Sequence, residues 1–395
     1  MVFIKTGKTG KVTQQREINK TIILNGFLRY KNISRADIAR KFNLSKSTVT
    51  RLVTQFLEEG VLIEVGSYSK GLGRKAVILS LNPEYKKAMA IKIGVTISTI
   101  AKVNFAMRIE ECIDFHTPEN HEEFIEKVAE GIEKLFPTGK EKIHAVGIGV
   151  PGIVNSTFKK IVIAPNLKWK DIPLATLLNR KIKSKFNINI PVKLDNEANL
   201  AVVAEGMLGE RIGLEDSNIV YVYIGEGIGT GLILEGKLYR GKKNTAGEFG
   251  HMTISKDGIL CKCGKKGCWE RYASLSSPIA KEMGIDINKE EIYVENKELI
   301  KEFANEIAFG IINIVNGLNP DVIILGGPLV TGANTNFWDD VRKEVIKQVR
   351  KFSITKEAGE VRIELTSFLK YPAELLGAGI WAFWDIFEGP VLSTV

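Results

Sequence analysis

Strand-like and helix-like runs alternate along most of this 395-residue chain. The strand-like runs include AMAIKIGV, HAVGIGVPGIV, NIVYVYIGEGIGTGLIL and DVIILGGPLV, and the helical runs include ATLLNRKIKSKF and KELIKEFANEIAFGIINIVNGL. Such alternation is typical of an α/β architecture, in which helices cover the faces of a sheet. Several strand-like runs end in glycine-rich turns, where phosphates or sugars often bind. The sequence therefore predicts an α/β body with a small-molecule site near its strand ends.

Positive charge is concentrated at the N-terminal end of the chain. Residues 1–80 contain 15 Lys and Arg against 5 Asp and Glu, whereas the rest of the chain contains 40 against 41. A basic segment joined to a near-neutral body is typical of a nucleic-acid-binding module fused to another domain. A solvated basic face is the alternative that charge alone leaves open.

The segment SRADIARKFNLSKSTVTRLVTQFLEEGVLIE, residues 34–64, predicts two helices joined by a tight turn. Ser34 and Asp37 form a capping-box start for the first helix, Ser45 caps the second, and Gly60 ends it. Apolar residues of the second helix recur at helical spacing, which predicts one buried side: Val49, Leu52, Val53, Phe56 and Leu57. This arrangement is typical of a helix-turn-helix motif.

The opposite side of the second helix presents hydroxyls and cations suited to base edges and phosphates in a major groove. These residues are Lys46, Ser47, Thr50 and Arg51. Two predicted strands follow, VLIEVGS and AVILSL, and the cationic loop between them is the expected wing. Gly71 and Gly73 would let Arg74 and Lys75 approach a DNA backbone or a narrow minor groove.

Residues 1–81 are therefore predicted to form a winged helix-turn-helix domain whose partner is operator DNA. The alternative is a small helical hairpin inside a larger domain.

Three of the four cysteines lie within eight residues, at Cys261, Cys263 and Cys268. In a reducing compartment such clustering favours a metal over a disulfide. Together with His251 they offer three thiolates and one imidazole, which is a closed tetrahedral set for structural zinc with no position for an activated water. Because the C-x-C-x4-C spacing differs from the paired C-x2-C of zinc fingers, reduced core cysteines are the alternative.

The chain contains no run of eighteen apolar residues, and its N-terminus lacks the apolar core of a signal peptide. We therefore expect a cytoplasmic protein with no membrane partner. The apolar stretch ELLGAGIWAFWDIF near the C-terminus predicts a helix that is packed in the core or at a subunit contact.

Seven stretches occur in an order that resembles the ROK family, which is named for repressors, open reading frames and kinases. The stretches are GVPGIV, APNLKW, DNEANLAVVAE, GEGIGTG, AGEFGHM, CKCGKKGCWE and NPDVIILGG. The resemblance implies a two-lobed, actin-like ATPase fold for residues 88–389, with a sugar in the cleft. The family combines sugar kinases, which lack the N-terminal basic segment, with winged-helix repressors of sugar operons.

Four residues depart from the pattern of the kinases that this chain resembles. The stretch KIGVT places Lys92 where those kinases have an Asp that organises Mg²⁺ and phosphates, and Val95 where glycine would let phosphate approach. GEGIGTG has Glu226 in place of a hydroxyl, and its charge would repel ATP. N-E-A-N has Glu197 in place of the general base Asp, which moves the carboxylate by about 1.5 Å. We therefore predict that the protein is not an enzyme, and an ATP-dependent, glucokinase-like sugar kinase is the alternative.

The residues that the family uses on sugar hydroxyls map to Asn196, Glu197, Glu248, His251 and Glu270. Carboxylates and amides suit this role because each can bridge adjacent hydroxyls. The N-E-A-N form resembles the xylose-responsive members, which favours xylose, with glucose or another aldohexose as a close alternative.

The resulting interpretation is a sugar-responsive repressor of a sugar-utilisation operon, released from its operator by a monosaccharide. Two winged helices on a homodimer would match a pseudo-palindromic site, and pairing of dimers into a tetramer stays open. Regulation by a protein partner in place of a free sugar is a further alternative.

Overall fold

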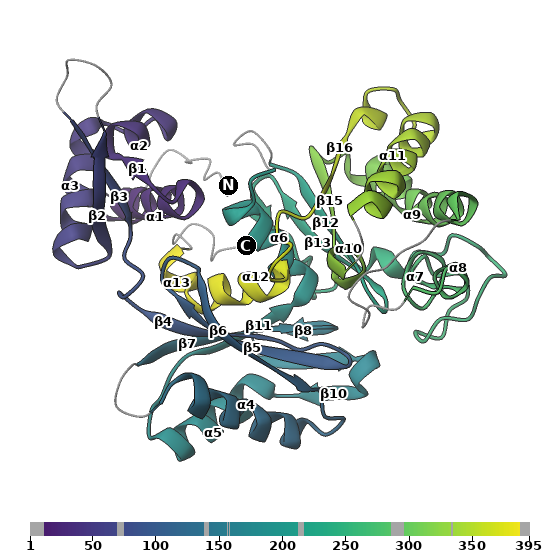
Figure 1. Cartoon of the computed structure of the whole chain (residues 1–395), viewed down its shortest axis with the longest axis horizontal. Coiled ribbons are helices and arrows are strands. Elements are labelled where there is room, and N and C mark those ends of the chain that lie inside the picture. Colours follow the sequence, from purple (N-terminus) through teal and green to yellow (C-terminus); the bar gives the residue numbers. More distant parts are fainter. Residues whose placement is uncertain are drawn as a thin grey trace.

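The computed structural model describes residues 12–68, 75–137, 142–155, 157, 159–211, 217–285, 296–332 and 335–387. An N-terminal unit lies beside two lobes, each built on a five-stranded sheet, with further helices between them (Figure 1). The α/β architecture expected from the alternating runs is confirmed.

The N-terminal unit, called the head from here on, combines three helices with a small antiparallel sheet of order β1-β3-β2. Ser34 accepts a hydrogen bond from the Asp37 amide at 3.2 Å, and Ser45 accepts one from the Thr48 amide at 3.1 Å, so both predicted N-caps are present. The elements are α1 (Val12–Tyr30), β1 (Ile33–Ser34), α2 (Arg35–Lys41), α3 (Lys46–Glu58), β2 (Leu62–Tyr68) and β3 (Ala76–Leu81).

The first lobe has a sheet of order β11-β7-β4-β5-β6, in which β4, β7 and β11 are parallel. Its strands alternate: Met89 and Ile91 pack into the cluster with α4 and α5, while Ala88 and Ala90 face the other way. The elements are β4 (Lys87–Lys92), β5 (Ile97–Asn104), β6 (Ile109–His116), α4 (His121–Leu135), β7 (Ile143–Val150), β8 (Ile153–Asn155), β9 (Lys160–Ala164), η1 (Pro165–Leu167), β10 (Trp169–Ile172), α5 (Leu174–Phe186) and β11 (Val192–Asn196).

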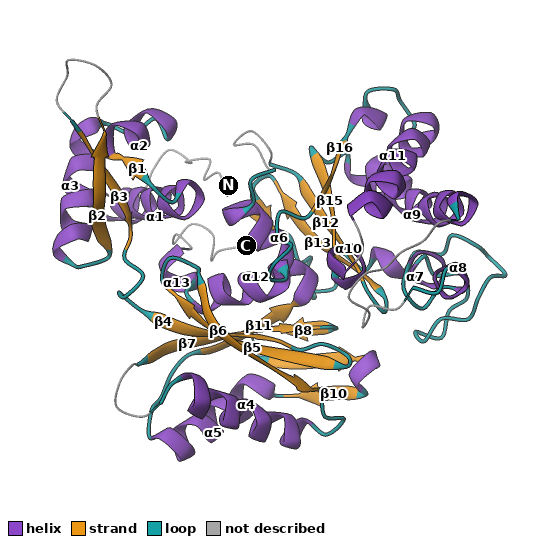
Figure 2. Ribbon diagram, viewed as in Figure 1, coloured by secondary structure: helices purple, strands orange, loops and turns teal. Residues whose placement is uncertain are grey.

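The second lobe repeats this plan with a sheet of order β14-β13-β12-β15-β16, whose outer face packs against α9 and α11 (Figure 2). The elements are β12 (Ile219–Ile224), β13 (Ile228–Leu234), β14 (Lys237–Leu238), η2 (Phe249–His251), α7 (Glu270–Ala273), α8 (Pro278–Glu282), α9 (Lys297–Leu318), β15 (Val322–Gly326), α10 (Pro328–Gly332), α11 (Thr335–Phe352), η3 (Ala358–Glu360) and β16 (Arg362–Leu365).

Two helices, α6 (Glu197–Leu208) and α12 (Ala373–Ala382), lie between the inner faces of the two sheets and are followed at the C-terminal end by α13 (Trp384–Phe387). Glycines allow close approach here: a Cβ at Gly147 would lie 1.9 Å from the carbonyl oxygen of Ala378, and one at Gly377 would lie 2.0 Å from that of Leu200. The apolar C-terminal stretch thus forms a helix packed in the core, which was one of the two locations predicted for it. None of the described helices is long and apolar enough to span a bilayer.

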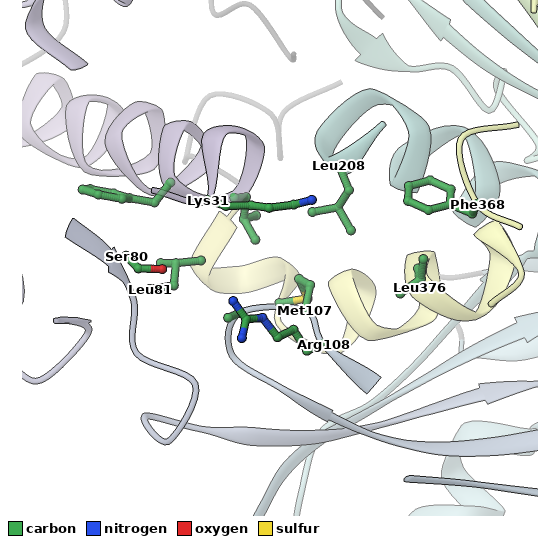
Figure 3. Close-up of a pocket in the computed structure, with 11 residues that line it drawn as sticks. Lys31, Ser80, Leu81, Met107, Arg108, Leu208, Phe368 and Leu376 are labelled. Carbon is green, nitrogen blue, oxygen red and sulfur yellow. The ribbon is translucent and has the colours of Figure 1, made fainter. Parts of the chain in front are cut away.

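The head packs directly on these central helices, and one apolar cluster includes side chains from both. The Asn25 amide donates to the carbonyl of Phe387 at 3.3 Å, and Arg29 donates to the carbonyl of Gly206 at 3.2 Å. Between the head and the lobes lies a cavity of about 330 Å³, lined among others by Phe27 and Leu208 (Figure 3). The C-terminal end of α6 therefore lies against the head.

Candidate functional site

The predicted metal ligands His251, Cys261, Cys263 and Cys268 come together in the second lobe, with their donor atoms within 4.8 Å of one another. Cys263 Sγ lies 3.6 Å from Cys268 Sγ, and Cys261 Sγ lies 3.7 Å from His251 Nδ1. In a tetrahedral zinc site with Zn–S bonds of about 2.3 Å, two sulfurs lie about 3.8 Å apart. The four residues therefore fit a zinc ion.

The loop that bears these ligands is shaped by glycines and by two isolated bridges, Thr253 with Cys268 and Leu260 with Lys266. Gly267 has φ +73°, and a Cβ on it would lie 1.6 Å from the carbonyl oxygen of Ser255, so no other residue fits there.

Trp269 anchors the end of the loop. Its ring is fully buried, and its indole N–H donates to the carbonyl of Glu306 on α9 at 2.8 Å. A Cβ at Gly310 of α9 would overlap the same ring, at 2.0 Å. Trp269 was not among the predicted site residues, although its position directly after the last cysteine is visible in the sequence.

Of the five predicted sugar residues, His251 is itself one of the predicted metal ligands, and Glu248 and Glu270 lie near it. Glu270 Oε1 lies 3.6 Å from His251 Nδ1 and accepts from Cys261 Sγ at 2.9 Å. A Cβ at Gly227 would lie 2.7 Å from Glu270 Oε2, so the GEGIGTG turn passes directly over this carboxylate. Glu248 is exposed to solvent, yet the protein groups around it raise its pKa by desolvation, with His251 opposing the shift and Glu270 adding to it. These groups form one polar cluster.

Asn196 is the N-cap of α6. Its side-chain oxygen accepts from the amides of Ala198 at 2.9 Å and Asn199 at 3.2 Å, and its Nδ2 donates to the carbonyl of Gly152 at 3.0 Å. Asn196 is also one of the predicted sugar residues, and its side chain makes these backbone contacts in the structure. The residue fixes the first turn of α6, which presents Glu197.

Glu197, the first residue of α6, is 8% exposed, and no described residue hydrogen-bonds its carboxyl. Burial raises the pKa of Glu197 to about 8, the nearby Glu374 adds to the shift, and Lys92 opposes it. At neutral pH the group is therefore a protonated acid, able to donate a hydrogen bond.

Strand β13 lies between Glu197 and the polar cluster of Glu248, His251 and Glu270. A Cβ at Gly231 would lie 2.0 Å from the carbonyl oxygen of Ala198 in the first turn of α6, and one at Gly250 would lie 2.1 Å from that of Ile228. Thr230 also donates to the carbonyl of Gly247. The start of β13 therefore lies between the first turn of α6 and η2, where Glu248 and His251 are found.

The residues that depart from the kinase pattern lie at the end of β4, in the turn after it, in the turn between β12 and β13, and at the start of α6. Lys92 ends β4, and its Nζ lies 3.5 Å from Glu374 Oε1 of α12. Val95 follows in the turn after β4, and Glu226 is exposed in the turn between β12 and β13. Lys92, paired with the buried Glu374, thus occupies the position at which the kinases have an Asp that organises Mg²⁺.

The predicted DNA-reading residues Lys46, Ser47, Thr50 and Arg51 are all exposed on α3. The other side of α3 is buried against the rest of the head. Lys75 is exposed directly before β3, whereas Gly71, Gly73 and Arg74 lie outside the described residues.

Glu197→Gln is expected to stabilise the protein at pH 8.5 by on the order of 3 kcal/mol and to change it little at pH 5. The folded-state pKa of Glu197 lies above its unfolded value, so the folded state binds more protons between pH 4.5 and about 8. Wild-type stability therefore falls as pH rises through that window, and the neutral amide removes the loss. Calorimetric Tm values of the wild type and of Glu197→Gln at pH 5 and pH 8.5 measure this difference in stability. Glu111→Gln, at an exposed glutamate, is the control. Equal effects of Glu197→Gln at both pH values would contradict it.

The fold and sequence match known proteins over nearly the full chain. The model of the ROK family matches residues 88–383. The xylose repressor of Caldicellulosiruptor bescii is 31% identical over 96% of this chain and 99% of its own length. Among solved structures, a ROK family transcriptional regulator, described as a homologue of the Escherichia coli Mlc protein, covers 95% of this chain with a TM-score of 0.71 at 18% identity. A ROK family glucokinase from Streptomyces griseus covers 75% of this chain with a TM-score of 0.63 at 24% identity. This chain is a member of the ROK family.

Proposed function

We propose that the protein is a sugar-responsive transcriptional repressor that leaves its operator when a monosaccharide binds between the lobes. The observation that carries the proposal is the path of α6, which begins at the buried Glu197 and ends at Leu208 against the head. A relative named as a xylose repressor aligns with nearly the whole chain, which favours the same function.

The head, residues 1–81, is the proposed DNA-binding domain, with α3 in the major groove and the segment between β2 and β3, including Gly71, Gly73, Arg74 and Lys75, as the wing. The exposed hydroxyls and cations of α3 support this assignment, because they stand opposite its buried face. A symmetric homodimer, or a pair of dimers, would place two such helices on a pseudo-palindromic operator.

The proposed sugar site, in residues 88–389, consists of Asn196, Glu197, Glu248, His251 and Glu270. Its support is chemical: the buried carboxyl of Glu197, which has no hydrogen-bond partner among the described residues, gains hydrogen bonds when sugar hydroxyls arrive. Xylose is the favoured ligand, because the relative aligned over nearly the full chain is named for it.

Zinc is the proposed metal, held by His251, Cys261, Cys263 and Cys268. Four protein ligands leave no open position, so the ion would fix the loop and do no chemistry. By joining both ends of the loop it would hold Glu248 and Glu270 toward the same ligand.

Loss of kinase activity is part of the proposal. The Lys92 ammonium, held by Glu374, disfavours a second cation at the place where kinases bind Mg²⁺. The general-base position holds Glu197, which keeps its proton at neutral pH and cannot accept another. The competing function is an ATP-dependent sugar kinase, and a coupled assay of ADP release over a sugar panel separates the two.

The test of the function combines sugar binding with DNA binding. Thermal shifts with a panel of monosaccharides identify the ligand, and gel shifts with the upstream DNA of the chain's own gene cluster show whether that ligand releases the DNA. A thermal shift with loss of the DNA complex supports the proposal. ADP release at about 1 s⁻¹ or faster would favour the kinase, and no shift with any sugar would favour a protein partner.

Arg29→Ala is expected to weaken the communication between the two sites. Arg29 of α1 donates to the carbonyl of Gly206 near the end of α6, so it transmits displacement of that helix to the head. Sugar affinity should stay within about twofold, while the sugar-induced loss of operator affinity should shrink about five- to tenfold. Titrations of each ligand with and without the other measure this coupling, and an unchanged coupling ratio would contradict the role of α6.

A further inference from the structure

Three ionisable side chains from three different elements come together where the lobes meet, and the two carboxyls are buried while the lysine is partly exposed. Lys92 ends β4, Glu197 begins α6, and Glu374 lies in the first turn of α12. Glu374 is 1% exposed and Glu197 is 8% exposed. Nothing in the kinase pattern or in the sugar-residue set assigns a role to Glu374.

Hydrogen bonds do not satisfy these carboxyls. Neither oxygen of Glu374 has a hydrogen-bond partner among the described residues, and its one contact with a charge is the Lys92 ammonium at 3.5 Å. Glu197 has no hydrogen-bond partner in that part of the chain either. A single ammonium can balance one buried carboxylate, so the second carboxyl is more stable with a proton.

The remaining groups around the cluster do not supply a second positive charge. Tyr221 of β12 is influenced by Glu374, and Tyr223 of the same strand by both carboxyls. Burial raises the pKa of each tyrosine well above its usual range, so both stay neutral. Glu226, which also acts on Tyr223, is a carboxyl and supplies no cation. Lys92 is thus the cation that both carboxyls share.

We propose that Glu374 is a positioning residue for ligand recognition: with Lys92 it retains one proton on Glu197, so that Glu197 meets the ligand as a hydrogen-bond donor. The inference rests on the proposed sugar function and deepens it, because it assigns the ligand atom at this position. That atom is an oxygen that accepts a hydrogen bond, such as a hydroxyl or ring oxygen of a neutral sugar.

The two partners of Glu197 act on its proton in opposite directions. In Glu374→Gln the repulsion is gone and Lys92 is free to pair with Glu197, so Glu197 should lose its proton at a lower pH. In Lys92→Met the attraction is gone and the proton should be retained to a higher pH. A role of Glu374 in packing alone would not produce shifts of opposite sign.

The first test is the pH dependence of sugar binding, measured by calorimetry with D-xylose and D-glucose. The association constant of the wild type should be constant to about pH 7 and should then fall about tenfold per pH unit above the pKa of Glu197, which is about 8. The fall should begin about one unit lower in Glu374→Gln and higher in Lys92→Met. Glu197→Gln, whose amide donates at every pH, should bind without this dependence.

The second test needs no sugar. Infrared difference spectra of the full chain at pH 6–7 should show the carbonyl stretch of a protonated carboxylic acid that is lost in Glu197→Gln, and its midpoint should move to lower pH in Glu374→Gln. If Glu374→Gln does not fold, the upward shift in Lys92→Met tests the same claim.

The outcomes separate the two proposals. Absence of the acid band in the wild type, or identical midpoints in all variants, would overturn the role of Glu374 even if sugar binds. An association constant for the sugar that is flat or rises between pH 6 and 9 would also overturn the role of Glu374. Absence of sugar binding with the band present and shifting would contradict the proposed function and support the retained proton.

Discussion

Cys263→Ser is expected to lower sugar affinity about a hundredfold while operator affinity changes less than about threefold. Cys263 is exposed, so serine costs little packing and the effect reports the lost metal ligand. With three ligands left, a metal ion would be held more weakly and would no longer fix the middle of the loop between His251 and Cys268. Glu270 follows that loop directly. Metal analysis, sugar calorimetry and gel shifts on the same preparation measure the three consequences.

Cys112→Ser is the matched control for this variant. Cys112 is also exposed, lies on β6 of the first lobe, and is not one of the predicted metal ligands. It should leave zinc content, sugar affinity and operator affinity unchanged. Loss of operator binding in Cys263→Ser with sugar affinity intact would show that the metal serves the head and not the sugar site.

Arg51→Ala is expected to reduce operator affinity on the order of 10- to 100-fold, because one good bidentate contact to a base is worth about 1–3 kcal/mol. Arg51 is exposed on α3, so alanine leaves the buried face of the helix and the fold intact. Gel shifts at fixed salt with the operator and with unrelated DNA measure the affinity and its selectivity.

The control for Arg51→Ala is Lys127→Ala, which removes the same charge from α4 of the first lobe. Lys127 forms an exposed ion pair with Glu130 and lies outside the head. An equal loss of operator affinity in both variants would mean that net charge accounts for binding, and α3 would not be the recognition helix.

The sequence predicted the features that depend on local spacing. Both N-caps of the helix-turn-helix follow from Ser34 and Ser45, and the metal-ligand group follows from a histidine and three cysteines within eighteen residues. The family and the fold class are confirmed by the match to residues 88–383 and by the sheets. The sugar-binding and DNA-binding roles of individual residues stay predictions.

Features that depend on distant partners escaped the sequence. Helix α1 has no one-sided apolar stripe, because it packs within the head on one side and against the central helices on another. Glu374 stands in an otherwise apolar run, and nothing near it in the sequence indicates a partner at Lys92. Asn196 is a different case, because its N-cap contacts are local: it matched a sugar-binding motif, and its spacing from Ala198 and Asn199 is also that of an N-cap.

The hydrogen bond from Asn25 to Phe387 joins residues 362 positions apart. During synthesis on the ribosome the head emerges first, but its docking surface is complete only after α13 has been translated. A nascent or prematurely terminated chain would present α3 without the contacts that report on the sugar site. If the head binds the operator as proposed, such a fragment would bind DNA without responding to the ligand, and control over the operator would be acquired only when translation of the chain is nearly finished.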